Sequence, residues 1–266
     1  MTEKRLDDLL HQKGYFESRA RARAAVMEGA VSVDGSYRVK PGTRVSEGQL
    51  IEVRETKPTC VSRGGLKLAH ALEVFRIDAA GKQWLDVGAS TGGFTECLLV
   101  RGASRVISLD VGKGQLHWKL RNDPRVTVLE GVNARYLKPE ILPFSPEWAS
   151  VDVSFISLRK VLLPVFSTLS GASEVVALVK PQFEAGRRCV GKGGVVRDSG
   201  VHREVLEGLS GWLEERGLHL AKATASPIRG PAGNLEFFIQ VSREAPALRV
   251  EEIEAVVRSA HTARSI

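Results

Sequence analysis

The stretch LDVGASTGGFTECLL, residues 85–99, leads from an apolar strand into a helix through a loop rich in glycine. Glycines at positions 88, 92 and 93 allow a tight turn and a close approach of the backbone to a ligand before the helix begins. Cofactor binding over such a turn is typical of open α/β sheets. We therefore expect a cofactor beside Gly88, Gly92 and Gly93.

Two further residues narrow the cofactor to one that contains a ribose. Asp110 ends the next predicted strand 22 residues after Gly88, where an acidic side chain can accept hydrogen bonds from ribose hydroxyls. The dinucleotide-binding fingerprint would place glycine at position 90, but the residue there is Ser90, which weakens the case for a nicotinamide cofactor. Since adenosine ribose is common to NAD and S-adenosylmethionine, this pattern alone leaves both cofactors open.

Predicted strands alternate with helices from Lys82 onward. In chain order the segments read QWLDVG, FTECLLVRG, RVISLD, RVTVLEG, WASVDVSF, RKVLLPVF and EVVALV. This alternation predicts an α/β fold with a doubly wound, mostly parallel sheet. The near-continuous apolar run at 175–179 is typical of a central strand that is covered on both faces.

That central strand ends on Lys180, directly before a proline that prevents the strand from continuing. Open α/β sheets place their chemistry at the carboxyl ends of the strands, so Lys180 is a candidate catalytic residue. The alternative is that a lone lysine caps the strand and extends its charged end into water.

The composition bounds the remaining possibilities. The chain has 266 residues, enough for one large domain and a smaller one, and its formal net charge of +7 is compatible with a polyanionic partner. The three cysteines, Cys60, Cys97 and Cys189, have no paired spacing, so we expect neither a disulfide framework nor a zinc site, and a reducing cytoplasm fits. The start MTEKRLDDLL and the lack of a long apolar run predict neither a signal peptide nor a membrane span.

The amino-terminal residues predict a separate small module. Residues 4–12 and 18–28 read as two short helices, the second with Ser18 as N-cap and Gly29 at its end. The stretch that follows alternates apolar and polar residues around an Asp34–Gly35 turn, which predicts a β-hairpin.

The basic residues of this module are either phosphate contacts or incidental charges on a solvated face, and their placement alone leaves both interpretations open. Arg19 and Arg23 lie four apart and share a helical face, and Arg38 and Lys40 are expected on one face of the hairpin. The opening RLDDLL, the basic second helix, and the motifs GAVSVDG and VKPGTRV together resemble the ribosomal protein S4 RNA-binding domain over about residues 4–54. The resemblance implies that Arg5, Arg19, Arg23 and Lys40 form an RNA face, which would position the module more than read sequence.

The motifs that follow extend a resemblance over nearly the whole chain. LDVGASTGGFTECLL, VISLDVGKGQLHWKLRNDPRV, NARYL, VDVSFISL, LVKPQFE, KGGVVRD and SPIRGPAGNLEFF stand in the order found in the TlyA family. The family implies an S4-like domain at 1–59, a linker at 60–63 and an FtsJ-like, S-adenosylmethionine-dependent methyltransferase domain at 64–266. In such a fold a late strand is antiparallel, for which NLEFFIQVS is a candidate. The family's activity is 2′-O-methylation of ribose in ribosomal RNA, at cytidine.

The same resemblance implies the site residues. For S-adenosylmethionine they are Gly88, Ser90, Gly92, Gly93, Asp110 and Asn133. For catalysis they are a Lys-Asp-Lys-Glu tetrad, Lys67, Asp152, Lys180 and Glu236, with no metal. Whether Lys180 acts as a base for the ribose hydroxyl or chiefly orients it stays open.

A basic, glycine-rich segment follows the candidate lysine. It contains Arg187, Arg188 and Lys192 and lacks apolar periodicity, which predicts a mobile loop that faces RNA, although an ordinary solvated loop is the alternative. Arg63, at the end of the linker, is a further candidate for RNA contact.

Two rival functions are a pore-forming haemolysin, as the family's historical name suggests, and a non-catalytic RNA-binding or ribosome-assembly factor. The expected partner is ribosomal RNA or a ribosomal subunit, and no obligate protein partner is evident. Family members differ in whether they modify one subunit or both, and longer terminal segments accompany the broader activity. The helix-like segment RVEEIEAVVRSAH favours both subunits.

Overall fold

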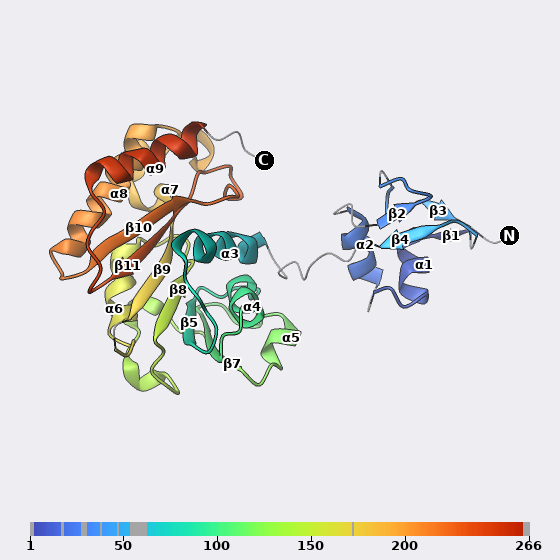
Figure 1. Cartoon of the computed structure of the whole chain (residues 1–266), viewed down its shortest axis with the longest axis horizontal. Helices are drawn as coiled ribbons and strands as arrows, with labels where there is room; N and C mark the ends of the chain where they lie inside the picture. The colour runs from blue at the N-terminus through green and yellow to red at the C-terminus, as the bar shows by residue number, and fades with distance from the viewer. Residues whose placement is uncertain are drawn as a thin grey trace. The chain divides into compact units, whose positions relative to one another are not determined.

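The computed structural model describes residues 3–16, 19–27, 31–37, 39–46, 48–53, 63–171 and 173–262. The chain forms two compact units, Met1–Thr59 and Cys60–Ile266. Figure 1 shows the helices and strands of each unit.

The small unit packs two helices against short antiparallel strands. Its elements are β1 (Lys4–Arg5), α1 (Leu6–Gln12), α2 (Arg19–Met27), β2 (Val31–Val33), β3 (Arg44–Val45) and β4 (Ile51–Val53). Strand β1 pairs with β3 and β2 pairs with β4. Leu6 and Leu10 of α1, Val26 of α2 and Val31 of β2 are buried in one apolar cluster. The expected N-cap Ser18 and the expected helix end Gly29 lie outside the described residues.

The predicted hairpin is wrong in its pairing. Asp34 and Gly35 do form a tight turn with φ of 50° and 77°, and Val33 and Ser36 exchange two backbone hydrogen bonds of 3.0 Å. The chain leaves the ladder after Ser36, and Lys40 begins a second turn, in which Pro41 has no N–H for a ladder and Thr43 N donates to Lys40 O at 2.9 Å. Lys40 therefore does not lie on a hairpin face, and Arg38 is not among the described residues.

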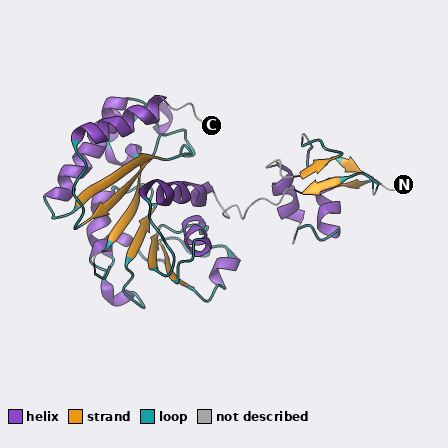
Figure 2. Ribbon diagram, in the orientation of Figure 1, coloured by secondary structure: helices purple, strands orange, loops and turns teal. Residues whose placement is uncertain are grey.

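The large unit is built on one seven-stranded sheet with the order β10-β11-β9-β8-β5-β6-β7 (Figure 2). The strands are β5 (Gln83–Val87), β6 (Arg105–Asp110), β7 (Val126–Glu130), β8 (Trp148–Val151), β9 (Glu174–Val179), β10 (His219–Ala225) and β11 (Phe237–Ser242). Strands β5 to β9 are parallel, and β11 runs antiparallel between β9 and β10. The predicted fold, including the late antiparallel strand, is confirmed.

Helices cover both faces of this sheet. They are α3 (Arg63–Phe75), α4 (Gly93–Val100), α5 (Trp118–Arg121), α6 (Leu162–Phe166), α7 (Pro181–Glu184), α8 (Ser199–Glu214) and α9 (Val250–Thr262). Alternate residues of β9 enter opposite cores: Val175 and Val179 pack with α6, α8 and α9, whereas Val176 and Leu178 pack with α3 and α4. Since side chains of a strand alternate between faces, this explains why the whole run is apolar.

A buried carboxyl group lies in the middle of the sheet, under the glycine loop. Asp86 of β5 is fully buried and accepts hydrogen bonds from Thr95 Oγ1 at 2.7 Å and Ser150 Oγ at 3.0 Å. Thr95 Oγ1 also lies 2.7 Å from Ser108 Oγ. Burial, more than the nearby charge of Asp152, raises the pKa of Asp86 to about 7.

We predict that Asp86 makes the protein less stable as the pH rises from about 4 to about 7. Within this window the carboxyl group of the unfolded chain ionises freely, with a pKa near 3.8, whereas ionisation in the folded chain costs desolvation. Asp86→Asn should remove this dependence. Urea unfolding of both proteins across this pH window checks the prediction. The free energy of unfolding of the wild type should fall by a few kcal/mol relative to that of the variant. If the difference between the two free energies stays constant with pH, the raised pKa of Asp86 is contradicted.

Candidate functional site

Two adjoining cavities lie where the parallel strands end. We call them the lysine cavity, of 520 Å³, because Lys67 and Lys180 line it, and the Asp110 cavity, of 540 Å³. Both are lined by Gly88, Ser90, Asp152, Ser154 and Phe155. The segment that follows β8 is therefore a wall common to the two cavities.

The glycine loop between β5 and α4 is held tightly against this wall. Gly88 has φ of +84°, and a Cβ atom added to it would lie 2.3 Å from the carbonyl oxygen of Asp152. Gly92 has φ of +101°, and its added Cβ would lie 2.2 Å from Leu120 Cδ1. Any side chain at either position would therefore displace its neighbour. Ser90 also has a positive φ, of 49°, so serine takes here a conformation that glycine favours.

The Asp110 cavity combines apolar walls with polar side chains, among them Asp110 at the end of β6 and Asn133 shortly after β7. Asp110 is the last residue of β6 and accepts backbone hydrogen bonds from Ser90 N at 2.8 Å and Gly112 N at 2.7 Å. Asn133 accepts one from Arg135 N at 3.0 Å. The apolar lining is Val87, Leu109, Val111, Val132, Ala134, Val153, Ile156 and Val161. Carboxylate acceptors beside apolar walls suit a nucleoside, with its ribose on Asp110 and its base between aliphatic side chains.

Four of the six predicted cofactor residues line a cavity: Gly88, Ser90, Asp110 and Asn133. The other two, Gly92 and Gly93, do not. Gly92 caps α4 and Gly93 begins it. Their small size lets the helix start close to the loop.

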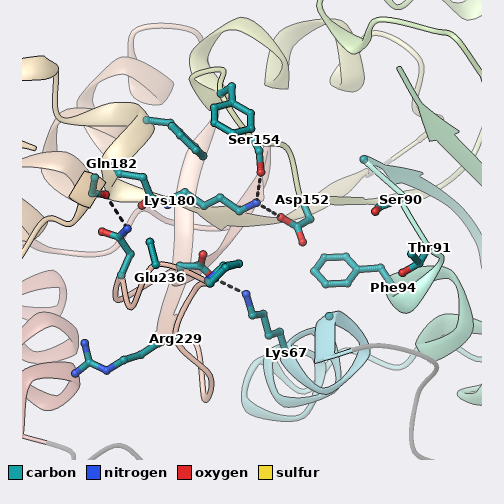
Figure 3. A pocket seen from close by; sticks show the side chains of 18 of the residues that line it. Lys67, Ser90, Thr91, Phe94, Asp152, Ser154, Lys180, Gln182, Arg229 and Glu236 are labelled. Atoms are coloured by element: carbon teal, nitrogen blue, oxygen red, sulfur yellow. Dashed lines mark hydrogen bonds and ion pairs between the residues drawn. The ribbon is translucent and has the colours of Figure 1, made fainter. Parts of the chain in front are cut away.

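All four residues of the predicted tetrad line the lysine cavity (Figure 3). They form two ion pairs: Lys67 Nζ to Glu236 Oε2 at 2.5 Å, and Lys180 Nζ to Asp152 Oδ1 at 2.7 Å. Lys180 Nζ also donates to Ser154 Oγ at 2.7 Å. Lys67 and Glu236 are buried, and Lys180 and Asp152 are nearly so. Each charge thus has a partner of opposite sign, which offsets the cost of removing it from water.

The topology explains how Glu236 reaches this edge. Residues that follow parallel strands gather at the carboxyl edge, as Asp152 and Lys180 do after β8 and β9. Strand β11 is antiparallel, with Phe237 opposite Val179, so the residue before its start lies at the same edge. Lys67 comes from the second turn of α3, whose Leu68 and Leu72 pack onto the sheet.

Phe155 is a lining residue that the sequence did not reveal. It is 90% exposed, has φ of 63° and lies with its ring centroid 5.1 Å from that of Phe183. A bulky residue at positive φ is strained, and such outliers gather at functional sites. The motif VDVSFISL contains Phe155, but a sequence motif does not specify the backbone conformation of its residues. Gln182, Arg229 and Asn234 also line the lysine cavity and were not predicted.

The basic residues of the small unit are arranged in two ways. Arg5 donates to both carboxylate oxygens of Asp7 at 3.0 Å, and Arg19 pairs with Asp8 at 2.9 Å. The hydrogen bond from Arg5 is the main cause that lowers the pKa of Asp7. Arg5, Arg23 and Lys40 line one surface hollow. Within the described parts of the small unit, Arg23 and Lys40 form no ion pair.

The basic segment after α7 folds into two 3-10 turns, Arg187–Cys189 and Lys192–Gly194. Arg187, Arg188 and Lys192 are exposed, and none of them lines either cavity. Asn234 ties the segment to the start of β11 through Gly194 O and Val196 N, each at 2.9 Å. Arg63 begins α3, and its side chain lies outside what the structure describes.

Neither a membrane span nor a metal centre is found in the part of the chain that the structure describes. No helix there has the length and apolar character needed to cross a bilayer. Likewise, no three metal-binding side chains gather among those residues.

Comparisons with known proteins give the same two-part division. Residues 60–243 match the FtsJ-like methyltransferase family, and residues 4–51 match the S4 domain. The chain is 44% identical over 258 residues to the 16S/23S rRNA (cytidine-2'-O)-methyltransferase TlyA of Mycobacterium tuberculosis, with 96% of each covered. It is 36% identical to the 23S rRNA (cytidine-2'-O)-methyltransferase TlyA of Campylobacter jejuni, over 67% of this chain and 69% of that one.

A solved structure is also similar over nearly the full length. It belongs to a Streptococcus thermophilus protein given the provisional name hemolysin. It covers 98% of this chain and 96% of its own, at 41% identity and a TM-score of 0.75.

We predict that Gly88→Ala abolishes binding of S-adenosylmethionine, because the added methyl group would push the Asp152 backbone away and distort the wall common to both cavities. Gly81→Ala is the matched control: Gly81 also has positive φ, of +72°, but an added Cβ there meets no atom within 4 Å. Both changes carry similar backbone strain. Titration calorimetry should show that only the Gly88 variant loses binding; equal losses in the two variants would assign the effect to strain alone.

Proposed function

Because this chain belongs to the FtsJ-like methyltransferase family and carries an S4 domain before the methyltransferase domain, we propose that it transfers a methyl group from S-adenosylmethionine to the 2′-hydroxyl of a cytidine ribose in ribosomal RNA. The TlyA proteins of Mycobacterium tuberculosis and Campylobacter jejuni bear the name of this activity. The observation that carries the proposal is the wall common to the two cavities, on which Asp152 and Ser154 meet Lys180.

The Asp110 cavity suits the adenosine part of the cofactor. Asp110 can accept from ribose hydroxyls, and the lack of a side chain at Gly88 lets the glycine loop pack against the Asp152 carbonyl in the wall of this cavity. S-adenosylmethionine supplies, when bound, a methyl group that the sulfonium charge has already activated. The protein must then mainly align the acceptor oxygen with that methyl group and manage one proton.

The lysine cavity supplies this alignment. Asp152 and Ser154 fix the Lys180 ammonium from one side, which leaves its remaining N–H direction for the ribose oxygen. Lys180 orients the ribose oxygen by donating a hydrogen bond to it, and because an ammonium cannot accept a proton, the hydroxyl proton would pass to solvent water as the oxygen gains the methyl group. The carboxylate of Asp152 lies in the wall of both cavities, where its negative charge favours a cation on the cofactor side. The buried Lys67–Glu236 ion pair lines the same cavity.

The small unit serves RNA docking. Arg5, Arg23 and Lys40 gather around one hollow, where they can contact phosphates, and Arg19 stands nearby in its ion pair with Asp8. We place the linker between the two domains at residues 60–63. The protein is proposed to act in the cytoplasm, and its partner there is ribosomal RNA. Exposed Arg187, Arg188 and Lys192, together with Arg63, are the proposed RNA contacts of the large unit.

Both ribosomal subunits are the proposed substrates. The helix-like segment near the carboxyl end is helix α9, and α9 packs into the core through Ile253 and Val257. The relative named for both RNAs is matched over 96% of its length, whereas the relative named for 23S rRNA alone is matched over 69%.

Mass mapping of ribosomal RNA tests the proposal. Purified protein and S-adenosylmethionine are incubated separately with each unmodified subunit, and nuclease fragments are weighed. One methyl group on the ribose of a cytidine in each subunit is expected. Methylation of a base would overturn the ribose assignment, and a product on the large subunit alone would overturn the dual substrate.

We predict that Lys180→Ala abolishes methyl transfer while RNA affinity stays within a few-fold, because the lysine acts in the transition state and not in docking. Arg23→Ala should do the reverse: RNA binding weakens, the salt dependence of log affinity falls by about 0.7 to 0.9, and turnover returns at saturating RNA. Filter binding and labelled-methyl transfer measure the two effects. Turnover of Lys180→Ala above about a tenth of wild type, a deficit of only about 1.4 kcal/mol, would show that the lysine merely caps its strand.

A further inference from the structure

We propose that Glu184 is a positioning residue for this reaction: its carboxylate ties the segment that carries Asp152 and Ser154 to the turn that carries Lys180. The proposal rests on the proposed function, since it concerns how the site for methyl transfer is held.

Glu184 makes two hydrogen bonds across the edge of the sheet. It is the last residue of α7, the short helix that begins at Pro181 immediately after Lys180. One carboxylate oxygen accepts from Ser157 Oγ at 2.7 Å and the other accepts from Leu158 N at 2.7 Å. Ser157 caps the 3-10 turn Leu158–Lys160, so Glu184 holds the start of that turn as well.

These bonds connect two segments that the sheet itself leaves unconnected. Strands β8 and β9 pair in parallel up to Val151 and Ala177. Beyond that point, the described residues of the two segments are joined through side chains: Lys180 to Asp152 and Ser154, the ring of Phe155 to that of Phe183, and Glu184 to Ser157 and Leu158.

The Glu184 contact differs from the others in its location. Lys180, Asp152, Ser154, Phe155 and Phe183 all line the lysine cavity, so a nucleotide that enters the cavity can touch them. Glu184, Ser157 and Leu158 line neither of the two cavities. The carboxylate bridge can therefore persist through the reaction and keep the lysine and the wall in register.

Burying the Glu184 carboxylate costs desolvation energy, which its two hydrogen-bond donors offset in part. Glu184 is half-buried, and burial raises the pKa of its carboxyl group, more than the hydrogen bonds from Ser157 and Leu158 lower it. A glutamine has the same shape and can keep both contacts, since its Oε1 accepts from Leu158 N and its Nε2 donates to the Ser157 hydroxyl. Glu184 thus acts by holding the two segments in position and not by its charge. Glutamine should preserve that position, and alanine should lose it.

The experiment measures kcat and the KM for ribosomal RNA in four proteins. Glu184→Ala should lower kcat by about tenfold or more, equivalent to about 1.4 kcal/mol, with KM within about twofold. Glu184→Gln should restore kcat to within about threefold of wild type. Glu174→Ala is the matched control, because Glu174 begins the same strand β9 at the opposite end and binds Gln240 there. Its kcat should be unchanged.

A double-mutant cycle separates positioning from loss of folding. If Glu184 acts through Ser157 and the turn after it, then Glu184→Ala combined with Ser157→Ala should be no slower than Glu184→Ala alone. Should Glu184→Ala fail to fold, Ser157→Ala alone must still lower kcat by severalfold. Multiplicative effects, a wild-type kcat for Glu184→Ala, or no recovery with glutamine would each overturn the proposal. A wild-type protein that methylates no RNA would instead overturn the proposed function itself.

Discussion

The backbone contact between Gly88 and the carbonyl of Asp152 is the constraint on which the site depends. With no side chain at Gly88, the ends of β5 and β8 come close enough for one segment to wall both cavities. Asp86, two residues earlier, is buried and accepts hydrogen bonds from the hydroxyl groups of Thr95 in α4 and Ser150 in β8. These bonds hold strand β5 in place beneath the loop. The position of the glycine loop thus decides where the two cavities meet.

The chain order of the sheet brings the opposite charges together. Lys67 and Glu236 are 169 positions apart in the sequence, yet they form the closest of the site's ion pairs. They meet because β11 is inserted antiparallel beside β9, which turns its beginning toward the edge where the parallel strands end. A parallel strand at that position would put Glu236 at the opposite edge, and Lys67 would be a buried charge without a partner.

The sequence predicts those parts of the molecule that repeat a pattern or a motif. The apolar run at 175–179, the glycine loop and the alternation of elements were enough for the fold, and motif context selected Lys67, Asp152, Lys180 and Glu236 as neighbours. Contacts set by the path of a loop were not predictable. The hairpin after Asp34–Gly35 was expected because the turn is favourable, but β2 takes the later β4 as its partner. The strained Phe155 and the bridge from Glu184 likewise depend on tertiary structure.

The common wall also has a thermodynamic consequence. Asp152, Ser154 and Phe155 face both cavities, so an occupant of one cavity that shifts this segment changes the free energy of binding in the other. Linkage requires that effect to be reciprocal: whatever factor RNA adds to the affinity for the cofactor, the cofactor adds to the affinity for RNA. Under the proposed function, the demethylated cofactor left after transfer lacks the sulfonium charge that would lie beside Asp152, so the same wall can couple loss of that charge to release of the modified strand.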